Sequence, residues 1–143
     1  MFVKLLVNLN SKELDTVLEL DKKSGFGVYQ WAKDNTGDIY GVYNDNNEIV
    51  GYCTIGGADD VIPLIKEIPN YNFEDYYLSD VYIKPEYRHK GYGTYMLKEA
   101  IKIKYRIEGI APIYLEVMYD DLKNFYSLVG FKTYKDTYVM IYN

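Results

Sequence analysis

The chain has 143 residues, 48% hydrophobic and 26% charged, with a net charge of −5; this predicts one globular domain over residues 1–143 and argues against a nucleic-acid partner. The sequence excludes a membrane helix, which needs about 20 consecutive apolar residues, and it carries no signal-peptide pattern. Its only cysteine, Cys53, excludes an internal disulfide, so we predict a cytoplasmic protein without a membrane partner.

Hydrophobic periodicity and turn residues predict the elements of the first half in chain order. These are a strand over 2–9, a helix over 11–23 with Ser11 as its cap, a break at 24–27, a short helix over 28–34, and strands over 38–45 and 48–57 joined by an Asn-rich turn. The first helix has an apolar face made of Leu14, Val17, Leu18 and Leu20. Residues 59–75 are the least regular part, because Pro63 and Pro69 limit any helix.

The second half begins with an alternating strand over 76–84, which Pro85 ends. A long helix from about 91 to 108 follows, and Gly109 and Pro112 stop it. Its apolar stripe consists of Met96, Leu97, Ala100, Ile101 and Ile107. The last elements are a strand over 113–119, a helix over 121–129 with Gly130 as its cap, and strands over 131–134 and 137–142. The order β-α-α-β-β-β-α-β-α-β-β predicts an α/β (α+β) fold with a central mixed sheet flanked by helices.

The stretch RHKGYG, residues 88–93, joins a strand to the start of the long helix. The first N–H groups of a helix have no intrahelical partner and the helix dipole is positive there, so a phosphate suits this position. Glycines let a ligand approach the backbone closely. No P-loop pattern is present, and the dinucleotide pattern lacks its third glycine, because Met96 stands there. The alternative is a plain surface turn.

The anion cradle predicted from this stretch contains Arg88, His89, Lys90, Gly91, Tyr92, Gly93 and Thr94. His89 and Tyr92 are expected to contribute through their backbone N–H groups. His89 is the only histidine, and we expect its side chain to face solvent and to take no part in catalysis.

The segment VYIKPEYRHKGYGTYMLKEAI resembles the acetyl-coenzyme A signature of the GNAT N-acetyltransferase superfamily. The segment LEVMYDDLKNFYSLVGFKTY is similar to a later motif of that superfamily, a strand and a helix with a tyrosine, followed by Gly-Phe and another strand. The resemblance covers the whole chain and implies a single-domain GNAT fold. It also implies transfer of an acetyl group from acetyl-CoA to a primary amine of a small molecule or peptide, by direct attack in a ternary complex. Val81, Tyr82 and Ile83 would then lie along the pantetheine arm of the cofactor and offer it backbone groups.

Acetylation needs a neutral amine, whereas a lysine-like amine has a free pKa of ~10.4. A base or a desolvating cleft must therefore remove a proton, and the departing sulfur benefits from an acid. The resemblance assigns the acid to Tyr126, and a merely packed tyrosine is the alternative in a chain with 18 tyrosines. Asp80 and Glu116 are the candidate bases; for each, the alternative is a strand carboxylate that faces solvent or a partner group.

With one histidine and one cysteine, we expect no zinc site, although carboxylates alone can bind a hard cation. Cys53 is expected to be a buried strand residue.

Charge is unevenly distributed along the chain. Residues 59–80 carry six acids against one lysine, and residues 81–106 carry seven Lys or Arg against two acids. This division suits either two ligands of opposite charge or two solvated faces. The acids within 71–77 would suit a cationic acceptor such as a polyamine, an aminoglycoside or a peptide amine.

Other functions remain alternatives. A tRNA-directed acetyltransferase toxin would be expected to carry more positive charge, which ranks it below an enzyme for small amines or peptides. A non-catalytic module of the same fold would bind an acyl-CoA as a sensor or partner without turnover; Tyr126 favours the enzyme. A homodimer is compatible with the sequence.

Overall fold

The computed structural model describes residues 1–25, 38–57 and 63–143. The described strands form one seven-stranded mixed sheet in the order β1-β2-β3-β4-β5-β7-β6, in which only β4 and β5 pair in parallel. The strands are β1 (Phe2–Leu5), β2 (Asp38–Tyr43), β3 (Ile49–Gly57), β4 (Tyr76–Ile83), β5 (Ile113–Glu116), β6 (Lys132–Thr133) and β7 (Val139–Tyr142). The predicted fold class is confirmed.

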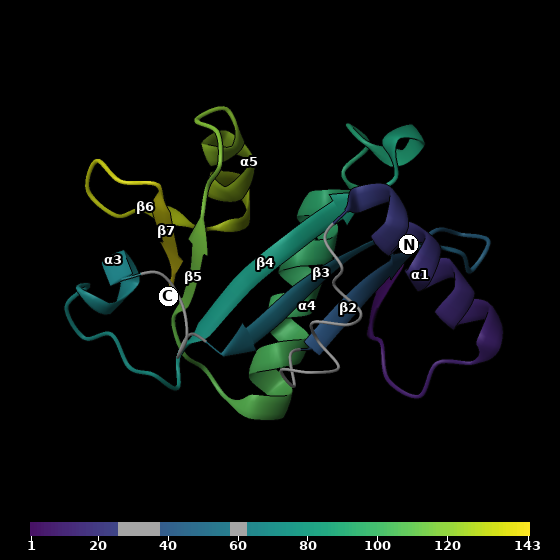
Figure 1. Cartoon of the computed structure of the whole chain (residues 1–143), viewed down its shortest axis with the longest axis horizontal. Coiled ribbons are helices and arrows are strands. Elements are labelled where there is room, and N and C mark those ends of the chain that lie inside the picture. The colour runs from purple at the N-terminus through teal and green to yellow at the C-terminus, as the bar shows by residue number, and fades with distance from the viewer. Residues whose placement is uncertain (26–37, 58–62) are drawn as a thin grey trace.

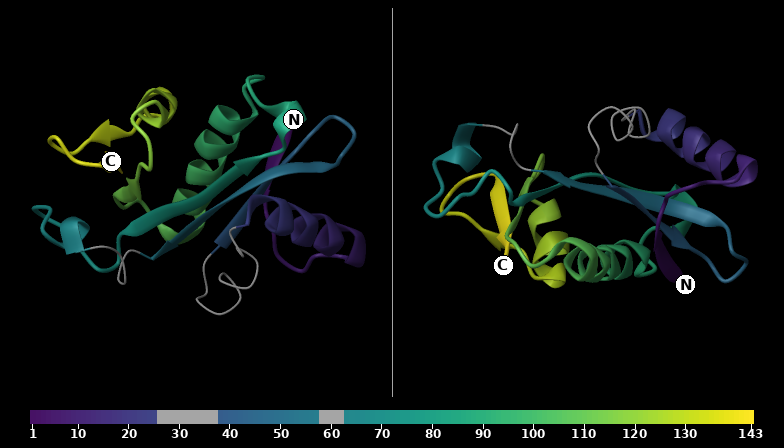
Figure 2. Two further views of the ribbon diagram at one scale, coloured as in Figure 1. Left: turned by 45° about the horizontal axis from the view of Figure 1, so that its top comes forward. Right: turned by 90° about the horizontal axis from the view of Figure 1, so that it is seen from below.

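Helices cover both faces of the sheet (Figure 2): α1 lies on one face, and α4 and α5 lie on the other. The described helices are α1 (Ser11–Ser24), α3 (Pro63–Lys66), α4 (Tyr92–Glu108) and α5 (Leu122–Val129), with a 3-10 turn η1 (Pro85–Tyr87). The short α3 was not predicted, and the helix predicted over 28–34 lies outside the described residues. In the described part of the chain, no helix has the length and apolar character that crossing a membrane requires.

The start of α1 is fixed by a capping box. The Asn10 side chain accepts a hydrogen bond from the Glu13 N–H at 2.8 Å, and the Glu13 carboxylate accepts one from the Asn10 N–H. The prediction of Ser11 as the cap was therefore wrong, because Ser11 is already helical. Leu20 is fully buried, but Leu18 is 44% exposed, so the apolar face is narrower than predicted.

α4 supplies much of the larger core cluster. Four residues of the predicted stripe are buried, Met96, Leu97, Ala100 and Ile101, because a spacing of three to four residues puts them on one helical face. Ile107 was wrongly included, since it is 58% exposed. Gly109 ends the helix as predicted, with a φ of 100°.

β4 and β5 separate along their length, as Figure 1 shows. They pair only at Tyr76 with Ile113 and at Tyr77 with Tyr114. We call the opening beyond Tyr77 and Tyr114 the β4–β5 fork. Beyond these pairs, β4 continues to pair with β3 on its other edge, and β5 continues to pair with β7.

On its other edge, β4 carries a bulge against β3. The pairing with β3 shifts between Tyr52 and Thr54, and Asp80 takes a left-handed conformation with a φ of 56°. A bulge bends its strand and redirects the side chains beyond it. Beyond the bulge, Tyr82 and Ile83 pair with β3 again, opposite Tyr52 and Gly51, while the other edge of β4 stays unpaired where the fork opens.

Candidate functional site

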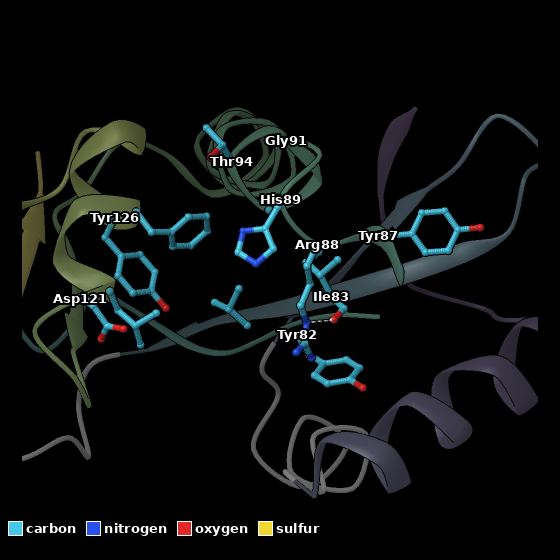
Figure 3. A pocket seen from close by; sticks show the side chains of 13 residues that line it. Tyr82, Ile83, Tyr87, Arg88, His89, Gly91, Thr94, Asp121 and Tyr126 are labelled. Carbon is cyan, nitrogen blue, oxygen red and sulfur yellow. Dashed lines mark hydrogen bonds between the residues drawn. The ribbon is translucent and has the colours of Figure 1, made fainter. Parts of the chain in front are cut away.

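A pocket of about 520 Å³ lies between the end of β4, the loop after it, the start of α4, and α5 (Figure 3). It brings together both sequence motifs, which are far apart along the chain. The predicted site residues that line it are Val81, Tyr82, Ile83, Arg88, His89, Gly91, Gly93, Thr94 and Tyr126.

The pocket reaches the N-terminus of α4. Gly91 is the N-cap with a φ of 87°, and no side chain caps this end. Within the described residues, the first N–H of this helix seen to donate is that of Tyr95, to the Gly91 carbonyl at 3.1 Å. A Cβ built on Gly91 would meet no atom within 4 Å. The backbone at Gly91 is therefore open to a ligand, and the N–H groups before Tyr95 lie at the positive end of a helix dipole, which suits an anion.

Arg88 is held by its own strand. Its Nε donates a hydrogen bond to the Ile83 carbonyl at 2.7 Å, drawn as a dashed line in Figure 3. The guanidinium carbon lies 5.3 Å from the centroid of the Tyr82 ring. The cation therefore ties the loop to the end of β4, a contact that the sequence did not indicate.

His89 has a left-handed backbone, with a φ of 59°. Figure 3 shows its imidazole pointing into the pocket, between Tyr126 and Arg88. The side chain is exposed to solvent, as predicted, and the exposed imidazole also lines the pocket, which was not predicted.

Two residues of the predicted cradle do not line the pocket. The Lys90 ammonium lies 5.9 Å from the centroid of the Tyr87 ring, and the Tyr92 ring packs edge-on against Tyr87 at 5.4 Å between centroids. Both side chains contact the Tyr87 ring and do not line the pocket themselves. The prediction for Tyr92 concerned only its N–H, which lies in the first turn of α4.

Tyr126 projects from α5, and its hydroxyl points into the pocket (Figure 3). Burial, with smaller contributions from Cys53 and Tyr77, raises the pKa of Tyr126 to about 12. A phenol with this pKa is protonated at neutral pH and can donate a proton. Cys53 is free and buried, as predicted, and burial raises the pKa of its thiol.

The two candidate bases lie outside the pocket lining. Asp80 is half-buried at the bulge and accepts hydrogen bonds from the hydroxyls of Ser79 at 3.1 Å and Thr54 at 3.4 Å. Burial raises its pKa, against the effect of these two hydroxyls. Glu116 is exposed at the end of β5, opposite Val139. The structure therefore puts neither carboxylate in contact with Tyr126.

The sequence analysis missed four lining residues: Tyr87, Asp121, Leu122 and Phe125. Phe125 has a specific role, because a Cβ on Gly93 would lie 3.0 Å from its Cζ. Gly93 thus allows α4 and α5 to approach closely. In the sequence, Phe125 directly precedes the predicted site residue Tyr126. This adjacency could have indicated that Phe125 lies near the site.

The acids within 71–77 do not reach this pocket. Asp75 is buried and accepts hydrogen bonds from the Tyr114 hydroxyl at 2.9 Å and the Asn72 N–H at 3.0 Å. The suggestion that it serves a cationic acceptor was wrong for Asp75, which stabilises the fold. In the described residues, no group of three or more His, Cys, Asp or Glu side chains is arranged to hold a metal ion.

The sequence profile of the Acetyltransferase (GNAT) family matches residues 6–131, most of the chain. The chain belongs to the GNAT family. It is therefore an acyltransferase by family, as the two motifs implied. Comparison with the sequences of curated proteins gives no significant match.

Solved GNAT structures share the fold at low sequence identity. The N-acetyltransferase YhbS from Escherichia coli, in complex with CoA, has a TM-score of 0.70 at 11% identity, over 99% of this chain and 79% of that one. YlbP from Bacillus subtilis, also with CoA, has a TM-score of 0.61 at 18% identity, over 99% and 95%. AtaT complexed with acetyl-methionyl-tRNAfMet has a TM-score of 0.64 at 15% identity, over 99% and 93%.

Proposed function

We propose that residues 1–143 form a single acetyl-CoA-dependent N-acetyltransferase domain. The observation that carries the proposal is the pocket itself. One end meets the uncapped N-terminus of α4, and the other meets the hydroxyl of Tyr126. A ligand with a phosphate at one end and a reactive thioester at the other fits this polarity. YhbS and YlbP, which share the fold, bind CoA.

Acetyl-CoA would be held mainly by backbone N–H groups and less by charged side chains. The N–H groups from His89 to Thr94 would bind the pyrophosphate, with the Thr94 hydroxyl as a further donor and Lys90 as a more distant cation. Val81, Tyr82 and Ile83 would run beside the pantetheine arm, because the edge of β4 toward β5 is unpaired beyond Tyr77. Holding both substrates in line supplies up to ~7–11 kcal/mol of the barrier.

The reaction forms a bond from the acceptor nitrogen to the acetyl carbon and breaks the carbon–sulfur bond. Tyr126 gives its proton to the departing sulfur, and the surplus proton of the new amide nitrogen restores the phenol. Before attack, the acceptor ammonium must lose one proton to a base. Asp80 is the better candidate, because burial raises its pKa toward the operating pH. Glu116, at the other arm of the fork, is the second. No step uses a metal ion.

The acceptor is proposed to be a primary amine of a small molecule or peptide, and a cationic one suits the carboxylates at the fork. The net charge of −5 disfavours a polyanion, although AtaT, with the same fold, is complexed with an acylated tRNA. The single free cysteine supports a cytoplasmic setting.

Release of free thiol from acetyl-CoA tests the function. The acceptor panel contains spermidine, kanamycin, a tetra-alanine peptide and methionyl-tRNA. Amine-dependent thiol release, with acetylated product found by mass spectrometry, supports the transferase. Binding of acetyl-CoA without thiol release by any member would instead favour a non-catalytic acyl-CoA sensor of the same fold.

A further inference from the structure

Tyr77 occupies the base of the β4–β5 fork. It is the last β4 residue that pairs with β5, opposite Tyr114, and the strands separate directly after it. Along β4, Tyr77 and Ser79 lie on one face of the strand, and along β5, Tyr114 and Glu116 do the same, because side chains alternate between the two faces. Beyond Tyr77, Ser79 and Asp80 lie on β4, which forms one side of the fork, and Glu116 lies on β5, which forms the other side.

The surroundings of this phenol link all three catalytic candidates. Asp80 and Glu116 both act on Tyr77: burial, then Glu116 and Asp80, raise the pKa of its phenol to about 12. Tyr77 in turn contributes to the raised pKa of Tyr126. No hydrogen bond joins Tyr126 to either carboxylate in the described residues, where Asp80 is bonded to Ser79 and Thr54.

The ring and the hydroxyl of Tyr77 have different environments. The half-buried ring packs against the small core cluster that includes Ile65, Ile68 and Tyr114. Its register partner Tyr114 uses its hydroxyl structurally, as a donor to Asp75 at 2.9 Å. The Tyr77 hydroxyl makes no hydrogen bond to any described residue, so the fold does not use it structurally as it uses the Tyr114 hydroxyl.

We propose that Tyr77 is a catalytic residue that contacts the acceptor amine at the base of the fork and transmits its surplus proton to Asp80. This inference rests on the proposed function. The ammonium nitrogen gives one proton to the Tyr77 oxygen, while the phenol passes its own proton to the Asp80 carboxylate. The step requires a water molecule between the two side chains, because no direct hydrogen bond joins them. Tyr77 is neutral before and after, and the proton ends on Asp80.

The raised pKa of Tyr77 is consistent with this role, because it keeps the phenol neutral and able to donate at neutral pH. The charged or titratable groups near Tyr77 in the described residues are Asp80 on its own strand, Glu116 and Tyr114 on β5, Tyr126 on α5, and Tyr71 and Tyr134, which pack against the same cluster. Asp75 is already engaged with Tyr114.

The test compares wild type with Tyr77→Phe, which keeps the ring in its cluster. The probe is whichever of spermidine, kanamycin and tetra-alanine peptide the wild type acetylates fastest, assayed from pH 7 to about 10. We expect kcat to fall about 10²-fold at pH 7. The deficit should shrink as pH approaches the ~10 range where the amine is already neutral. The dissociation constant of CoA and the urea midpoint should stay within error.

Two further variants separate a relay from a structural effect. Tyr77→Phe combined with Asp80→Asn should be no slower than the slower single variant, because both act in one proton path. Tyr138→Phe, on an exposed tyrosine of the β6–β7 hairpin, should leave activity unchanged. Equal activity of Tyr77→Phe and wild type, a deficit independent of pH, or additive losses would overturn the relay while the transferase stands. A wild type that acetylates none of these amines would overturn both.

Discussion

The Nε of Arg88 donates to the carbonyl of Ile83 at 2.7 Å, and the guanidinium lies over the Tyr82 ring. The cation that begins the glycine-rich loop thus anchors that loop to the strand beside the pocket. We expect Arg88 to affect CoA binding through the position of the loop more than through its charge.

We therefore expect Arg88→Gln and Arg88→Lys to weaken CoA binding by a similar factor, about tenfold. A hydrogen bond from a charged donor contributes about 1.5–3 kcal/mol, and neither variant restores the Nε geometry. Isothermal titration at about 50 and 500 mM salt should give the same factor. If lysine restored the affinity, or if high salt abolished the loss for glutamine, the charge would contact the ligand directly. Lys132→Gln, which removes an exposed cation on β6 outside the pocket lining, is the control.

Gly93→Ala should weaken CoA binding about tenfold, because the new Cβ would lie 3.0 Å from Phe125 Cζ and push that ring toward the pocket. Phe125→Leu in the same chain should restore much of the affinity by making room. Gly91→Ala is the matched comparison: its Cβ meets no atom within 4 Å, but the φ of 87° is strained for alanine. That variant should mainly lose stability, by about 1–2 kcal/mol. An unchanged affinity in Gly93→Ala would contradict the packing argument.

Tyr126→Phe should lower kcat about 10²-fold and leave the affinity for CoA within twofold, because the ring stays in place. The defect should be much smaller with the acetyl thioester of an acidic aryl thiol, which leaves without a proton. Tyr138→Phe controls for the loss of a phenol at a distant site. A defect of equal size with both donors would mean that Tyr126 does not act as the acid.

Asp80→Asn should make the protein more stable at pH 7 and less active. Burial raises the pKa of Asp80 in the folded state, so its protonated form stabilises the fold. That contribution is complete below the unfolded pKa of ~3.9 and is lost as pH rises through the folded pKa. At pH 7 the charged carboxylate is therefore unfavourable, and the amide removes this cost.

Urea unfolding at pH 7 and at about pH 3.5 checks this prediction, and the stability gain should shrink at the lower pH. Glu116→Gln should leave the urea midpoint unchanged, because that carboxylate is exposed. We expect kcat of Asp80→Asn to fall about 10²-fold. A lower midpoint for Asp80→Asn at pH 7 would show that its hydrogen bonds with Ser79 and Thr54 matter more than its burial.

Much of the fold and the donor pocket followed from local sequence. The spacing of Met96, Leu97, Ala100 and Ile101 predicts the buried face of α4, since helical periodicity is a property of neighbours along the chain. The motif at 88–94 predicts an anion site at the start of that helix for the same reason, because the unpaired N–H groups belong to the helix itself.

The tertiary structure decided the contacts between distant segments. Periodicity places Tyr77, Asp80 and Glu116 on strands, but only the strand pairing of the folded chain shows that β4 and β5 diverge beyond Tyr77 and Tyr114. Likewise, no local pattern indicates that Asp75 is buried under Tyr114 or that Arg88 is tied to Ile83. Such pairings depend on strand register and on the packing of elements far apart in the chain, which local propensity does not encode.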